Sequence, residues 1–168
     1  MNFIFRDVCI KLLCLFYCFI ILSCSEKKLP ILGIRHFENG DTIYTQIPDF
    51  RLADQFNDTL SKDQLKGQIH IADFFFTSCP TICPKTMRNM VRIANHFEHR
   101  QGINYLCFSI DYKKDSVARL KNYYEKLGIH YKNFHLLHIP TKEEVKQISE
   151  NYMSIALEDP TAPGGFDH

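Results

Sequence analysis

Residues 69–84 read IHIADFFFTSCPTICP, a mainly apolar run that leads directly into two cysteines, Cys79 and Cys83. The run at 69–76 is typical of a strand that is buried inside a sheet. Apolar side chains then recur at helical spacing within residues 85–100, which predicts a helix. Both thiols are therefore expected at the carboxyl end of a strand and at the amino end of a helix.

Strand and helix patterns go on alternating after this helix. Buried-strand patterns occur at 103–110 and at 134–139. One helical pattern follows Asp115, a candidate N-cap, and another follows Thr141, which forms a capping box with Glu144. Strands and helices that alternate in this way form a mainly parallel sheet with helices on both faces. The sequence therefore predicts an α/β fold.

Turn signals mark the region before the first of these strands. Asn39-Gly40-Asp41 and Asn57-Asp58 each stand beside residues with strand character, which predicts a small β-rich section. No internal repeat or low-complexity tract follows residue 40. We therefore expect one domain at residues 41–168.

The composition excludes several classes of protein. Of the 168 residues, 45% are hydrophobic and 23% are charged, which is enough apolar material for one core. Collagens, disordered chains and polytopic membrane proteins are thereby excluded. Lys and Arg number 20, Asp and Glu number 19, and no local basic run stands out. A nucleic-acid partner is therefore not expected.

The start of the chain has the pattern of an export signal. Arg6 and Lys11 precede an unbroken apolar run at residues 12–22. This run is too short to cross a bilayer, which takes about 20 helical residues, but it suits the apolar part of a secretory signal. Residues 1–23 are therefore interpreted as a signal peptide, with a simple anchor helix as the alternative.

The end of this signal resembles the lipobox of bacterial lipoproteins. In Ile21-Leu22-Ser23-Cys24, the cysteine would carry the lipid and become the first mature residue. Residues 24–40 then form a linker. This interpretation predicts a membrane-anchored lipoprotein of a bacterial cell envelope, with its domain facing the periplasm or the exterior.

Three more cysteines, Cys79, Cys83 and Cys107, remain in the mature chain. In an oxidising compartment, two thiols four positions apart are expected to be paired, metal-bound or redox-active. Cys107 lies inside a predicted strand and is interpreted as a core residue. Cys79 and Cys83 are therefore the candidate functional cysteines of the exported chain.

The position of Cys79 and Cys83 favours thiolate chemistry. Free N–H groups and the positive dipole end of a helix stabilise a thiolate, the form that binds metals and attacks disulfides. Residues at i and i+4 share one helix face, so both sulfurs are expected to point at one ion. The same pair could instead close a disulfide. Two soft thiolates select copper, zinc or an iron–sulfur cluster, and a metal site would need a third ligand from elsewhere.

Histidines supply the candidates for that third ligand. His70, His135 and His138 lie on predicted strands, where satisfied or surface histidines are the simpler interpretation. His168 differs, because it follows Gly164-Gly165 in a loop of the kind that brings a backbone close to a site.

The segment FFFTSCPTICP at 74–84, followed at a distance by GGFDH at 164–168, resembles the Sco (SenC) family of thioredoxin-like copper proteins. In that family, two cysteines and one distant histidine bind copper. Its members help to assemble the dinuclear copper centre of cytochrome c oxidase. The resemblance implies a thioredoxin-like fold, a copper ion as cofactor, and Cys79, Cys83 and His168 as metal ligands.

The resemblance has two departures. Asp111 and Asp115 match a family segment, but Tyr112 and Lys113 replace its usual Pro-Glu. Asp111 is expected either to tune the copper environment from behind the ligands or to cap a loop. The family also continues past its histidine with a β-hairpin and a last helix. This sequence is therefore expected to be truncated after His168.

Three functions follow as hypotheses. The first is a copper metallochaperone, not an enzyme, which is anchored to the membrane by lipid and delivers copper to the copper-bearing subunit of cytochrome c oxidase. The second is a thiol–disulfide oxidoreductase that uses the Cys79/Cys83 pair as a redox disulfide. The third is an anchored binding module that truncation has left without activity.

Overall fold

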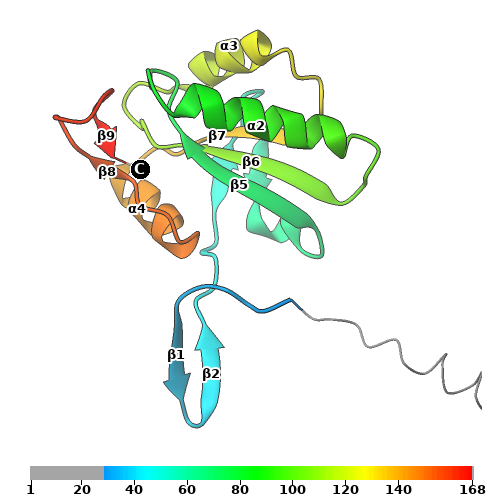
Figure 1. Cartoon of the computed structure of the whole chain (residues 1–168), viewed down its shortest axis with the longest axis vertical. Coiled ribbons are helices and arrows are strands. Elements are labelled where there is room, and N and C mark those ends of the chain that lie inside the picture. Colours follow the sequence, from blue (N-terminus) through cyan, green and yellow to red (C-terminus); the bar gives the residue numbers. More distant parts are fainter. Residues whose placement is uncertain (1–28, 168) are drawn as a thin grey trace, which may run out of the picture. The chain divides into compact units, whose positions relative to one another are not determined.

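The computed structural model describes residues 29–167 (Figure 1). The residues from Gly33 onward form one compact unit, and residues 29–32 before it are exposed and irregular. No helix in the described part is long and apolar enough to cross a membrane. The predicted signal peptide, Cys24 and His168 lie outside the described residues.

A five-stranded sheet forms the centre of this unit, in the order β4-β3-β7-β6-β5. Its strands are β3 (Arg51–Ala53), β4 (Thr59–Ser61), β5 (Ile69–Phe75), β6 (Ile103–Ser109) and β7 (Phe134–His138). The strands β5, β6 and β7 are parallel to one another, as the alternating pattern predicts. The shorter strands β3 and β4 join the sheet in antiparallel fashion, so the sheet is mixed.

Helices cover both faces of the sheet (Figure 1). They are α2 (Cys83–His96), α3 (Val117–Leu127) and α4 (Lys142–Asn151), and a short 3-10 helix, η1 (Lys62–Leu65), follows β4. Adjacent residues of β5 point to opposite faces. Phe75 packs on Tyr123 of α3, with ring centroids 5.6 Å apart, while Phe74 packs on Tyr152 at the end of α4, 6.0 Å away. The α/β fold class is confirmed.

Both predicted helix starts are close to the observed ones, but one cap is wrong. Thr141 caps α4 and accepts a hydrogen bond from the Glu144 N–H at 3.2 Å, as predicted. The cap of α3 is Ser116, whose hydroxyl accepts from the Arg119 N–H at 3.4 Å. Asp115 does not cap the helix, because its carboxylate is buried and bonds to other segments.

The core lies between the sheet and these helices. Phe75, Phe108 and Leu136 from the three parallel strands are fully buried. Each contributes about 1.5–3 kcal/mol relative to an exposed side chain. Cys107 is also fully buried, with its sulfur 4.0 Å from the sulfur of Met87 on α2, and burial raises its pKa well above that of an ordinary thiol. The core interpretation of Cys107 is confirmed.

Three hairpins complete the described chain. The predicted turns at Asn39-Gly40 and Asn57-Asp58 are present, the first between β1 (Arg35–Glu38) and β2 (Asp41–Tyr44), the second between β3 and β4. The stretch from Glu158 onward, which the sequence suggests is a loop that leads to His168, takes part in a short hairpin of β8 (Leu157–Glu158) and β9 (Phe166–Asp167). This hairpin matters because it leads to His168.

Candidate metal and redox site

The two cysteines lie on the loop that joins β5 to α2. Cys83 is the first residue of α2, and Pro84 occupies the first turn, where its missing N–H is not needed. Cys79 lies in the loop before the helix, so the expectation that both cysteines share one helix face is wrong. The two side chains are nevertheless brought together by the loop. The Cys83 N–H donates to the Cys79 sulfur at 3.4 Å, and the two thiol side chains are also hydrogen-bonded to each other.

The surroundings of the two thiols are unequal. Burial opposes ionisation of Cys79, but hydrogen bonds from Cys83 and Thr81 outweigh it and lower the pKa of the Cys79 thiol. Burial and the hydrogen bond to Cys79 raise the pKa of Cys83 to about 12. The residue is 1% exposed, against 7% for Cys79. The loop therefore holds one activated thiol beside one protected thiol.

This inequality predicts which cysteine reacts first. Limiting iodoacetamide at neutral pH should alkylate Cys79 well before Cys83, because the thiolate is the reacting form. Cys107, fully buried, should stay unmodified and serves as the internal control. Peptide mass spectrometry of the reduced chain at several times measures the order. Alkylation of Cys83 ahead of Cys79 would contradict the assignment.

A buried carboxylate holds the loop just before Cys79. Asp115 is fully buried, and it accepts hydrogen bonds from the Thr77 N–H at 2.8 Å, from the Thr77 hydroxyl and from the Ser109 hydroxyl at 2.7 Å. Arg119 adds its Nε, which donates to the Thr77 hydroxyl oxygen at 2.6 Å and lies 3.4 Å from the Asp115 carboxylate. Because Thr77 is two residues before Cys79, this network sets where the loop begins.

The β8–β9 hairpin approaches the same loop from the other end of the chain. The Phe166 ring packs on Phe76 with centroids 5.2 Å apart. A Cβ at Gly164 would lie 2.5 Å from the Phe76 ring and 3.4 Å from the Pro80 ring, and its φ of +90° is one that side chains rarely allow. The backbone at residue 164 therefore lies so close to the cysteine loop that only glycine fits there.

The other polar residues that the sequence singles out have partners of their own. Asp111 is buried and its carboxylate accepts from the Lys114 N–H at 3.1 Å, which is the loop-capping role. His70 lies against the Tyr152 hydroxyl, and His135 against Asp54. Within residues 29–167, no three side chains of His, Cys, Asp or Glu are grouped so as to hold a metal.

Asp115 is the residue whose role was missed. Its sequence signal, a carboxylate just before a helical pattern, is the one that N-caps share.

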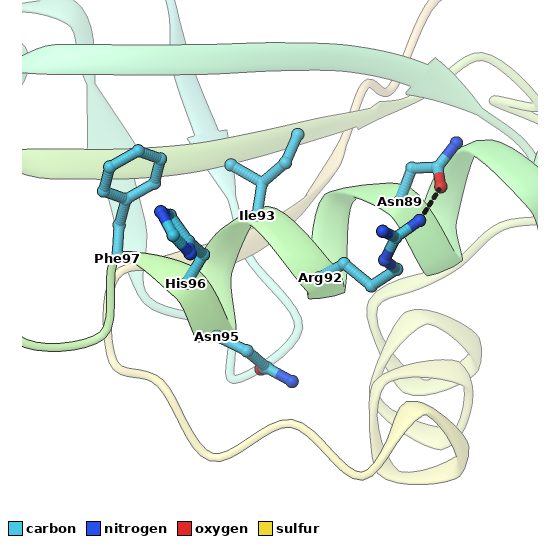
Figure 2. A pocket seen from close by; sticks show the side chains of 6 residues that line it. All are labelled: Asn89, Arg92, Ile93, Asn95, His96 and Phe97. Atoms are coloured by element: carbon cyan, nitrogen blue, oxygen red, sulfur yellow. Dashed lines mark hydrogen bonds between the residues drawn. The ribbon is translucent and has the colours of Figure 1, made fainter.

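A separate pocket lies along α2, lined by Asn89, Arg92, Ile93, Asn95, His96 and Phe97, where Arg92 donates to Asn89 at 3.4 Å (Figure 2). These side chains include no thiol and a single histidine, so this pocket is a poor site for a soft metal.

The dithiol loop between a parallel strand and a helix, in a sheet with helices on both faces, is arranged as in solved Sco structures, and the fold is thioredoxin-like. Residues 41–168 match the SCO1/SenC family model, and the chain belongs to that family.

Relatives and solved structures agree with this assignment. An SCO2-like protein of Rickettsia conorii is 29% identical over 139 residues, which are 80% of this chain and 63% of that protein. The chain thus spans less than two thirds of this relative. A SCO1/SenC family lipoprotein from Bacillus anthracis is 26% identical, with a TM-score of 0.62 over 73% of both chains. Copper-bound yeast Sco1 is 26% identical, with a TM-score of 0.56 over 72% of this chain and 66% of that chain.

Proposed function

We propose that this chain binds copper through Cys79 and Cys83 and delivers it during the assembly of cytochrome c oxidase. The observation that carries the proposal is the β5–α2 loop, in which the thiol side chains of Cys79 and Cys83 are hydrogen-bonded to each other, so that two soft donors lie side by side. Yeast Sco1, a relative of the same fold, has been solved with copper bound, and the Sco family is one of cytochrome c oxidase assembly proteins. The recipient in this proposal is the copper-bearing subunit of the oxidase.

The chemistry of the donors suits copper that must be passed on. Two thiolates prefer Cu(I), and an added imidazole also suits Cu(II). Both thiols give up their protons when a metal binds, so binding is favoured as the pH rises. A site with three protein ligands stays open to an incoming ligand from the recipient. Copper is here a cargo, and an open site lets it leave.

His168 is proposed as the third ligand. Its support is the hairpin that leads to it: Phe166 packs on Phe76, and Gly164 lies against Phe76 and Pro80 of the cysteine loop. His168 follows β9 directly in the sequence. Asp111 caps the neighbouring loop. It is proposed not to bind the metal itself but to influence the polarity around the three metal ligands.

Copper titration tests the proposal. The protein is the 168-residue chain with Cys9, Cys14, Cys18 and Cys24 replaced by alanine, here called the three-cysteine chain, so that Cys79, Cys83 and Cys107 are its only thiols. In competition with a Cu(I) chelator, the reduced form should take up one copper ion. The form with a Cys79–Cys83 disulfide should take up none. Equal uptake by both forms would contradict the proposal.

The unequal thiols favour a second candidate, a thiol–disulfide oxidoreductase. An activated Cys79 would attack a disulfide of the substrate, and Cys83 would then release the mixed disulfide by forming the Cys79–Cys83 bond. The substrate disulfide is reduced to two thiols while the pair is oxidised. Catalysed reduction of a disulfide substrate by the copper-free chain, in the presence of a dithiol reductant, would support this candidate. A rate equal to that of the double Cys79→Ser/Cys83→Ser variant would exclude it.

We further propose that Cys24 carries a lipid and anchors the exported domain to a bacterial membrane. The lipobox-like sequence supports this, as does the B. anthracis relative, which is a lipoprotein. Cys24→Ala should abolish incorporation of a fatty-acid probe, whereas Cys18→Ala should leave it unchanged. One acyl chain holds a protein only marginally, so stable anchoring requires more than one. Unchanged labelling of Cys24→Ala would contradict the lipid site.

A further inference from the structure

Three donors from two distant segments converge on Glu158, the second residue of β8. The Lys113 ammonium donates to Oε1 at 2.6 Å and the Tyr112 hydroxyl to the same oxygen at 3.0 Å. The Lys142 ammonium donates to Oε2 at 2.9 Å. Tyr112 and Lys113 lie in the loop after β6, and Lys142 is the first residue of α4. These four residues are here called the Glu158 cluster.

The Glu158 cluster is joined to the cysteine loop through one strand pair. Glu158 is paired with Phe166 of β9, and Phe166 packs on Phe76 at the start of the cysteine loop. The β8–β9 hairpin is therefore held from both sides, by charge on the β8 side and by ring packing on the β9 side. Figure 1 shows the hairpin beside α4, whose first residue is Lys142.

We propose that the Glu158 cluster is a positioning device that holds the β8–β9 hairpin against the cysteine loop and so directs His168 toward the metal. The positioning of the hairpin stands on the contacts of described residues alone. The consequence for the metal rests on the proposed function.

The short strands make such a device necessary. The strands β8 and β9 have two residues each, and an isolated two-stranded hairpin is marginal even when it is longer. A single exposed ion pair adds little stability. Here, however, one carboxylate that is only 27% exposed receives three donors, and such charge-assisted hydrogen bonds are the stronger kind. Lys113, Lys142 and Tyr112 lower the pKa of Glu158 to about 2, so the carboxylate stays charged throughout the neutral range.

Hydrogen exchange tests the positioning without any metal. In the reduced, metal-free three-cysteine chain, Glu158→Gln should speed amide exchange of residues 157–167 at least threefold and leave β5, β6 and β7 unchanged. The matched control is Glu150→Gln, which removes an exposed ion pair with Lys146 on α4 and should not affect the hairpin. Lys113→Met should act in the same direction as Glu158→Gln. Unchanged exchange of 157–167 in Glu158→Gln would overturn the proposal.

Copper binding tests the link to the ligand separately. Glu158→Gln should weaken Cu(II) binding at least threefold and alter the visible spectrum of the Cu(II) form, while Cu(I) affinity stays within twofold of the parent. If the hairpin loosens and Cu(II) binding is unchanged, the link from hairpin to ligand is overturned. If the parent binds no copper at all, the proposed function fails, and hydrogen exchange still decides whether the Glu158 cluster holds the hairpin.

Discussion

Cys79→Ser and Cys83→Ser are each expected to abolish tight Cu(I) binding by the three-cysteine chain. Either change removes one of two thiolates, and a hydroxyl is a poor ligand for so soft an ion. Competition with a Cu(I) chelator measures the loss. Both variants should fold as the parent does, since serine is the closest polar replacement in size, and circular dichroism checks this.

Cys107→Ala is the matched control for these variants. Cys107 is buried beside Met87 and belongs to the core, so its loss should leave copper binding intact. If the double Cys79→Ser/Cys83→Ser variant bound Cu(I) as tightly as the parent, the copper site would have to be elsewhere in the chain.

Asp115→Ala is expected to cause the largest loss of stability among single changes near the site. It leaves the Thr77 N–H, the Thr77 hydroxyl and the Ser109 hydroxyl without their acceptor. Hydrogen bonds to a charged group contribute about 1.5–3 kcal/mol each, and loss of a buried charge partner costs about 3–5 kcal/mol. We therefore expect the free energy of unfolding to fall by about 3 kcal/mol or more, measured by urea denaturation of the reduced chain.

Asp63→Ala provides the comparison for Asp115→Ala. Asp63 forms an exposed ion pair with Lys66 at 2.8 Å, and because solvent screens such a pair, its loss should change the free energy of unfolding far less than Asp115→Ala does. A similar small loss for Asp115→Ala would show that the buried network does not hold the loop.

The position of the dithiol was predictable, because strand and helix patterns meet at the cysteines. The start of the helix was also readable from the prolines to within one residue. A residue before proline is pushed away from helical angles, and proline itself suits the first turn. Pro80 therefore disfavours a helix that includes Cys79, and Pro84 favours one that begins next to Cys83. Cys79 and Cys83 consequently do not share a helix face, because only Cys83 belongs to α2.

The contacts of Asp115 and Glu158 could not be predicted in this way. Asp115 bonds to a residue 38 positions before it, and Glu158 to one 45 positions before it. Such partners depend on how the elements pack, which a local pattern does not contain. The β8–β9 hairpin was missed for the same reason, since two residues per strand show no alternation and tertiary contacts make the pairing stable.

The close approach of Gly164 to Phe76 has a consequence for how this gene can vary. Any substitution at codon 164 adds at least a Cβ, which would meet the Phe76 ring at 2.5 Å. Natural variation at this position should therefore be rare, and a replacement should survive selection mainly where residue 76 has become smaller. The residue types at positions 164 and 76 are thus expected to co-vary during the evolution of this protein.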